Sequence, residues 1–118
     1  MAENMLDKVK EIEKLLRNLN KEYPEATSSF LRFLTKVIKE RALTTKEKEL
    51  ISLALGIATG CEWCIALHAK NAIEAGATPE QLIEAGFVAV LMAGGPALMH
   101  FIPLMDAINQ FYNKETKE

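Results

Sequence analysis

Both cysteines of this chain lie in one short motif that can carry out redox chemistry. Cys61 and Cys64 form a C-x-x-C pair, and His68 follows four residues after the second cysteine. Residues three or four positions apart on a helix share one face. The two thiols can therefore join as a disulfide or share a metal ion, and the imidazole can exchange a proton with Cys64. The motif thus holds a nucleophile, a resolving partner and a base.

The sequence favours each cysteine as the nucleophile for a different reason. A thiol must ionise before it attacks, and its ordinary pKa is about 8.5. Cys61 follows Gly60 at a helix start, where free N–H groups and the helix dipole favour a thiolate. Cys64 has His68 one turn later as an acceptor for its proton. Spacing alone leaves the choice between the two cysteines open.

A carboxylate upstream of the motif can complete a proton relay. Glu49 lies twelve residues before Cys61 and is the last charged residue before an apolar run. If the chain reverses at Gly60, the flanking helices form a hairpin and Glu49 approaches His68. A buried carboxylate must be paired, and this one would orient the imidazole in a Glu–His–Cys relay. The alternative is a solvated glutamate near a helix start.

The elements that must position these residues are predicted to be helices throughout. Apolar residues recur at helical spacing over residues 5–19 and again over 30–38, with the second helix ending near Arg41. Thr44 and Glu47 form a capping box that begins a third helix over 45–59. This third helix is apolar nearly all round, so we expect it to be central.

Helix start and stop signals predict three more helices. The C-x-x-C motif begins the fourth, which ends at Gly76 as a left-handed residue. Thr78 caps a fifth helix that starts at Pro79 and runs to about residue 93, with Gln81 completing a second capping box. A sixth covers 96–112 and is expected to kink at Pro103.

These elements predict a single all-α domain over residues 1–118. Within it we expect an N-terminal helix pair in 1–42, a compact motif-bearing core in 43–112 and a frayed tail in 113–118. No strand alternation, repeat or low-complexity linker interrupts the chain.

Composition narrows the classes of function. With 14 basic and 16 acidic residues the net charge is −2, and no basic run indicates nucleic-acid binding. Residues 85–105 carry no Asp, Glu, Lys or Arg, yet Gly94-Gly95-Pro96 divides them, which predicts two buried helices and no membrane span. The chain opens into a charged amphipathic segment without a signal peptide, so we expect a cytoplasmic protein.

Two consequences follow from this composition. In a reducing compartment a C-x-x-C pair is typical of a catalytic or metal-binding site. The C-terminal two-thirds is also too apolar for a chain of 118 residues to bury alone, so we expect a homo-oligomer.

The full pattern Glu49-x11-Cys61-x2-Cys64-x3-His68 resembles the signature of the AhpD-like alkylhydroperoxidases, within the carboxymuconolactone decarboxylase superfamily. The resemblance extends through residues 43–51, through 68–81 and to the glycine-rich turn at 94–96. It covers residues 43–105, whereas the N-terminal helix pair carries little of it.

The resemblance implies an all-helical fold that assembles through its helices, commonly as a trimer or hexamer. It implies that Cys64 attacks a hydroperoxide and becomes a sulfenic acid, that Cys61 condenses with it to a disulfide, and that His68 and Glu49 relay protons. A dithiol or thioredoxin-like donor would then reduce the disulfide. The implied chemistry needs no cofactor and no metal.

The residues between the cysteines depart from the better-characterised members, which often carry a histidine there. Here the positions are Glu62 and Trp63. A carboxylate beside Cys61 should disfavour its thiolate a little, which suits a resolving role. Trp63 is expected to pack over the disulfide region or to line an entrance.

Other interpretations of the motif remain open. It could serve a general dithiol–disulfide oxidoreductase, a zinc site built from all four residues, or a non-catalytic interaction protein with buried cysteines. Carboxymuconolactone decarboxylase activity is a further possibility by superfamily, although that branch generally lacks the C-x-x-C pair. His100 lies in an apolar run with no nearby acid, so we expect a satisfied core or interface histidine.

Overall fold

A computed structural model describes residues 4–112, and helices are the sole regular elements in that range. The all-helical class is therefore as predicted, and the expected tail 113–118 lies outside the described residues. The elements in chain order are α1 (Met5–Glu22), α2 (Pro24–Ile38), α3 (Thr45–Thr59), α4 (Glu62–Glu74), α5 (Pro79–Ala93), α6 (Gly95–Met99), α7 (Phe101–Ala107) and the π-helical segment η1 (Ile108–Tyr112).

Both predicted capping boxes are present and fix the starts of α3 and α5. Thr44 accepts from the backbone N–H of Glu47 at 3.0 Å and donates its own N–H to that carboxylate at 2.8 Å. Thr78 and Gln81 exchange the equivalent bonds at 3.2 and 3.0 Å. Hydrogen bonds from Thr44 to the Glu47 carboxylate hold the pKa of Glu47 below its ordinary value. The bond from the Thr44 backbone N–H has the larger effect, and the bond from its side chain the smaller.

The expected kink at Pro103 is wrong, because the last predicted helix is interrupted at His100 instead. The His100 N–H bonds to the carbonyls of Pro96 and Ala97 at the end of α6, and α7 starts at the next residue. Proline lacks the N–H that a helix interior requires. A new helix start places Pro103 in a first turn, where that hydrogen bond is not needed.

The predicted end of the second helix near Arg41 is three residues too late. α2 ends at Ile38, and a lysine from α3 holds its last turn. The Lys48 ammonium donates to the carbonyls of Val37 and Lys39, each at 2.7 Å. A side-chain cation thus replaces the N–H groups that a further turn of α2 would supply.

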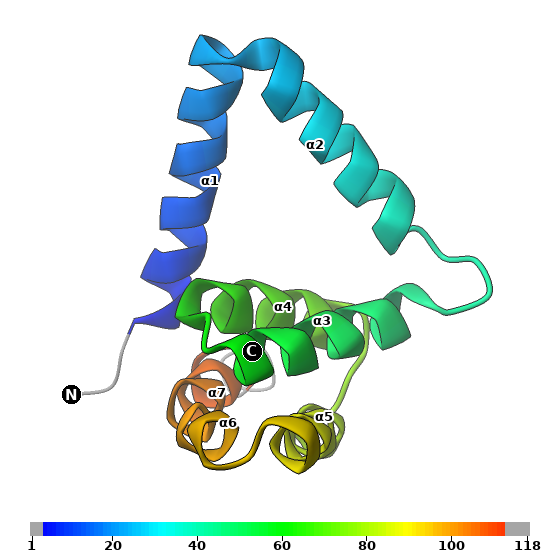
Figure 1. The fold of residues 1–118 in the computed structure, drawn as a ribbon, viewed down its shortest axis with the longest axis vertical. Coiled ribbons are helices and arrows are strands. Elements are labelled where there is room, and N and C mark those ends of the chain that lie inside the picture. Colours follow the sequence, from blue (N-terminus) through cyan, green and yellow to red (C-terminus); the bar gives the residue numbers. More distant parts are fainter. Residues whose placement is uncertain (1–3, 113–118) are drawn as a thin grey trace.

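The core lies where α3 and α4 pack as a hairpin, with α5, α6 and α7 against them (Figure 1). α1 reaches this body through its first turns, and the Met5 N–H donates to the Gln110 side chain at 2.7 Å. The large side chains with no exposed surface come from five helices: Met5, Leu53, Ile57, Ile65, Leu82 and Leu104.

α2 stands away from this body, and α1 and α2 diverge from their turn (Figure 1). Thr27 is the sole buried residue of α2, whereas Phe33 on its apolar face is 66% exposed. α3 is central as expected, since it packs against α4 and α5, yet Ile51 and Leu55 on its outer side are exposed. At the C-terminal end of α5, Met92 is 82% exposed. The protein therefore presents exposed apolar side chains on α2, α3 and α5.

Within residues 4–112, no helix combines the length and the apolar composition that a bilayer span requires. The stretch 85–105, which carries no charged side chain of Asp, Glu, Lys or Arg, is divided between α5, α6 and α7.

Assembly into a homo-oligomer stays a prediction, and the exposed apolar side chains generate its test. We expect light scattering to give a multiple of the 13.1 kDa chain mass. Phe33→Ser should lower that mass or raise the concentration needed for assembly, because it removes apolar area from a subunit contact. Arg32→Ser, on the same helix, is the matched control. A single-chain mass for the unmodified protein would contradict the prediction.

Candidate redox site

The reversal between α3 and α4 brings the four predicted site residues into one region. Gly60 ends α3 with φ +72°, a left-handed conformation that favours glycine. The next residue, Cys61, is the N-cap of α4, and its N–H donates back to the Gly56 carbonyl at 2.9 Å. The chain therefore turns directly before the motif, as the hairpin hypothesis requires.

Cys61 and Cys64 are joined as a disulfide across the first turn of α4. The S–S distance is 2.09 Å and the Cα atoms lie 5.2 Å apart. The Cys64 N–H also donates to Cys61 Sγ at 3.1 Å, so Cys61 caps the helix with its sulfur. The pairing implied by the resemblance is present, and both residues are partly exposed.

The close approach of α3 to Cys64 depends on a second glycine. A Cβ added at Gly56 would lie 3.1 Å from Cys64 Cβ and 3.5 Å from the Ile65 nitrogen. An alanine at this position would require Cys64 to move by a few tenths of an ångström, and a larger residue would require more. Gly56 was not among the residues predicted for the site, although its position four residues before Gly60 is a signal of close helix packing.

Glu49 and His68 form the buried contact that the hairpin hypothesis predicted. Glu49 is 4% exposed, and its Oε1 lies 2.7 Å from His68 Nδ1. A carboxylate can only accept, so Nδ1 donates and Nε2 of a neutral ring is left to accept a proton. The alternative of a solvated Glu49 is wrong. The contact is established, while the catalytic roles of the four residues stay predictions.

The geometry does not give the zinc hypothesis a ligand set. Among residues 4–112, no three Cys, His, Asp or Glu side chains are grouped as metal ligands would be. Both sulfurs are already joined to each other, and the Glu49 carboxylate is occupied by His68. The arrangement instead combines a dithiol pair with a hydrogen-bonded acid–base pair.

α1 contacts both residues that lie between the cysteines, a contact that was not predicted from the sequence. Trp63 is 45% exposed, and its Nε1–H donates to Glu11 at 2.8 Å. The Lys8 ammonium lies 4.2 Å from the centre of the Trp63 ring and 3.6 Å from the Glu62 carboxylate. Lys8 and Glu11 share a face of α1 by their spacing, but no local pattern links them to residues 62 and 63.

His100 approaches the motif from the junction of α6 and α7. Its Nδ1 donates to the Pro96 carbonyl at 2.8 Å, so the expectation of a satisfied histidine is confirmed. Two ring atoms would lie 3.2 Å from a Cβ added at Gly60. The imidazole therefore packs against the residue that precedes Cys61.

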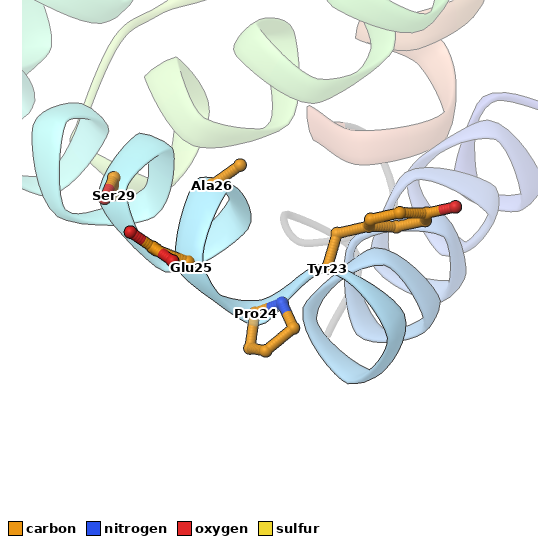
Figure 2. Close-up of a pocket in the computed structure, with 5 residues that line it drawn as sticks. All are labelled: Tyr23, Pro24, Glu25, Ala26 and Ser29. Carbon is orange, nitrogen blue, oxygen red and sulfur yellow. The ribbon is translucent and has the colours of Figure 1, made fainter.

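A surface hollow at the turn between α1 and α2 does not form part of this site. Tyr23, Pro24 and Ser29 line it together with Glu25 and Ala26, and their side chains do not converge on one point (Figure 2). Tyr23 follows Glu11 by twelve residues, which is about 18 Å along a helix at 1.5 Å per residue. No cluster of chemically reactive groups converges there.

Comparisons with known proteins identify the family and the fold of this chain. The model of the carboxymuconolactone decarboxylase family matches residues 24–107, a range that contains all four site residues. A protein of Cupriavidus necator is 30% identical over 112 residues, with 92% of this chain and 99% of that protein covered. A crystal structure of an apo carboxymuconolactone decarboxylase family protein from Legionella pneumophila gives a TM-score of 0.86 at 36% identity, and covers 91% of this chain and 96% of that one.

One relative with a named activity aligns over a shorter range. The alkyl hydroperoxide reductase AhpD of Mycobacteroides abscessus is 33% identical over 69 residues. These residues make up 58% of this chain and 39% of that protein.

The buried Glu49–His68 contact predicts unequal costs for removing its two partners. His68→Ala leaves a buried carboxylate without this donor and should lower the free energy of unfolding by about 2 kcal/mol. Glu49→Gln keeps an acceptor oxygen and should cost less than about 1 kcal/mol. Urea denaturation measures both. If the double variant Glu49→Gln/His68→Ala is as unstable as His68→Ala alone, the unpaired Glu49 carboxylate is not what destabilises His68→Ala.

The reversal at Gly60 predicts a costly substitution. Gly60→Ala forces a left-handed backbone on alanine and should lower the free energy of unfolding by about 1–2 kcal/mol. The new methyl group would also meet the His100 ring. In a His100→Ala background the same substitution should therefore cost less. Equal costs in the two backgrounds, measured by urea denaturation, would show that the ring contact contributes nothing.

Proposed function

This chain belongs to the carboxymuconolactone decarboxylase family, and on that premise we propose that it is a thiol-dependent peroxidase that reduces hydroperoxides. The observation that carries the proposal is the coexistence of two features on one helix hairpin. The Cys61–Cys64 disulfide supplies the redox pair. The buried Glu49–His68 contact supplies an oriented base one turn after Cys64.

In the proposed reaction the Cys64 thiolate attacks the terminal oxygen of a hydroperoxide. An S–O bond forms, the O–O bond breaks, and the alkoxide leaves with a proton as an alcohol. Cys64 is then a sulfenic acid. The Cys61 thiolate attacks Cys64 Sγ, the S–O bond breaks, and hydroxide takes a proton to leave as water. The product is the Cys61–Cys64 disulfide, and the peroxide has gained two electrons.

His68 and Glu49 serve proton transfer in this proposal. With Nδ1 bonded to the carboxylate, His68 Nε2 can take the proton of the Cys64 thiol and return it to the departing alkoxide. The Glu49 carboxylate holds the ring in this tautomer and stabilises its charged form. Because Glu49 is buried, its interaction with an imidazolium is screened less than at the surface.

A reductant must complete the cycle, and we propose a dithiol or thioredoxin-like protein. A thiolate of the donor would attack one sulfur of the Cys61–Cys64 disulfide and form a mixed disulfide. The second thiol of the donor would then attack the donor sulfur of this mixed disulfide and release the protein with both cysteines reduced. Both cysteines are partly exposed, so this exchange does not require the fold to open. A general dithiol–disulfide oxidoreductase would share these last steps and would differ in its reaction with peroxide.

Single-cysteine variants test the proposal. Reduced protein mixed with an organic hydroperoxide in a stopped-flow instrument should lose its thiols at a rate proportional to peroxide concentration. Cys64→Ser should abolish sulfenate formation, whereas Cys61→Ser should leave a sulfenate that a dimedone probe traps. His68→Ala should slow the first step on the order of a hundredfold.

Three outcomes would count against the proposal. If Cys61→Ser is the inactive variant, the nucleophile is Cys61. If the unmodified protein ignores peroxide but exchanges disulfides with a dithiol, it is a general oxidoreductase. If it does neither, the pair is structural.

A further inference from the structure

Lys8 of α1 places a positive charge next to the turn that carries both thiols. Its ammonium lies 3.6 Å from the Glu62 carboxylate and 4.2 Å from the centre of the Trp63 ring. The Lys8 side chain is only 14% exposed, so it is largely withdrawn from water. α1 lies outside residues 24–107, the range matched by the family model.

The charge of Lys8 bears on thiol ionisation through Glu62. Glu62 immediately follows Cys61, and a bare carboxylate there would oppose the formation of a thiolate nearby. An ammonium paired with that carboxylate cancels part of its field around the turn that carries the cysteines. Since Lys8 is largely withdrawn from water, the cancellation is screened less than between two fully exposed charges.

Other charged or titratable groups also surround the motif and must be separated from Lys8 by the test. They are Glu11 on α1, Glu49 on α3, His68 on α4 and His100 at the junction of α6 and α7. Lys70, which is also on α4, is paired with Glu74 at 2.6 Å, further along the helix.

We propose that Lys8 is a positioning residue for the dithiol: it pairs with Glu62 from α1 and thereby keeps the motif thiols able to ionise near neutral pH. The proposal rests on the proposed function only in assuming that the thiols react as thiolates. It assigns to the N-terminal helix a part in the chemistry of the motif, and it answers the expectation that Glu62 would disfavour the Cys61 thiolate.

Alkylation of the reduced protein by iodoacetamide across a pH series tests the proposal without peroxide. The assay is run on Cys61→Ser and Cys64→Ser backgrounds, so that each remaining thiol is followed alone. Lys8→Met should raise the pH midpoint of alkylation by about half a unit for at least one thiol. This shift corresponds to alkylation that is about threefold slower near neutral pH. Lys8→Arg, which keeps the charge, should restore most of the rate.

Second variants separate charge from structure. Glu62→Gln added to Lys8→Met should return the midpoint most of the way, because no carboxylate is left uncovered. Glu62→Gln alone should lower the midpoint, a readout that does not depend on how well Lys8→Met folds. Lys10→Met removes a charge from an exposed position of the same helix, and should leave the profile unchanged.

The outcomes distinguish this inference from the proposed function. An unchanged profile in Lys8→Met, or equal profiles for Lys8→Met with and without Glu62→Gln, would overturn the role of Lys8. A protein that shows the expected profiles but does not react with hydroperoxide would overturn the peroxidase proposal and leave the role of Lys8 intact.

Discussion

The close packing of α3 on α4 is the constraint on which the rest of the site depends. Gly56 allows the α3 backbone to lie against Cys64, and Gly60 provides the left-handed turn between the helices. Glu49 and His68 are nineteen positions apart in sequence, yet their side chains meet at 2.7 Å. Without the hairpin a glutamate near the start of α3 would be an ordinary surface charge. With it, that glutamate is buried and must bond to the imidazole.

The parts of the fold that sequence could predict are those determined within one or two helical turns. The capping boxes of α3 and α5 and the left-handed Gly76 are local, and each lies where the pattern indicated. The Glu49–His68 contact was also accessible, because a single turn joins its two helices. Once the position of the turn is known, the spacing along the sequence determines which residues of the two helices lie opposite each other.

The contacts that could not be predicted join segments whose relative placement depends on the whole fold. Lys8 and Glu62 are 54 residues apart, and His100 follows Gly60 by forty. No periodicity in either segment indicates the other. The break at His100 is of the same kind, since the proline at 103 marks a disturbance of the helix without showing at which residue it occurs. The exposure of the apolar face of α2 could not be predicted for another reason. An apolar stripe indicates that one face of a helix is to be buried. It does not show whether the same chain or another molecule buries that face.

The tryptophan of this protein has a consequence of a different kind. The chain contains one tryptophan, and it lies between the two cysteines, with its ring nitrogen bonded to α1. Indole emission from the intact chain therefore comes from the redox turn alone, where the ring contacts Lys8 and Glu11 of α1. The turn that holds both cysteines therefore carries the single indole fluorophore of the chain, so its surroundings can be observed on unlabelled protein.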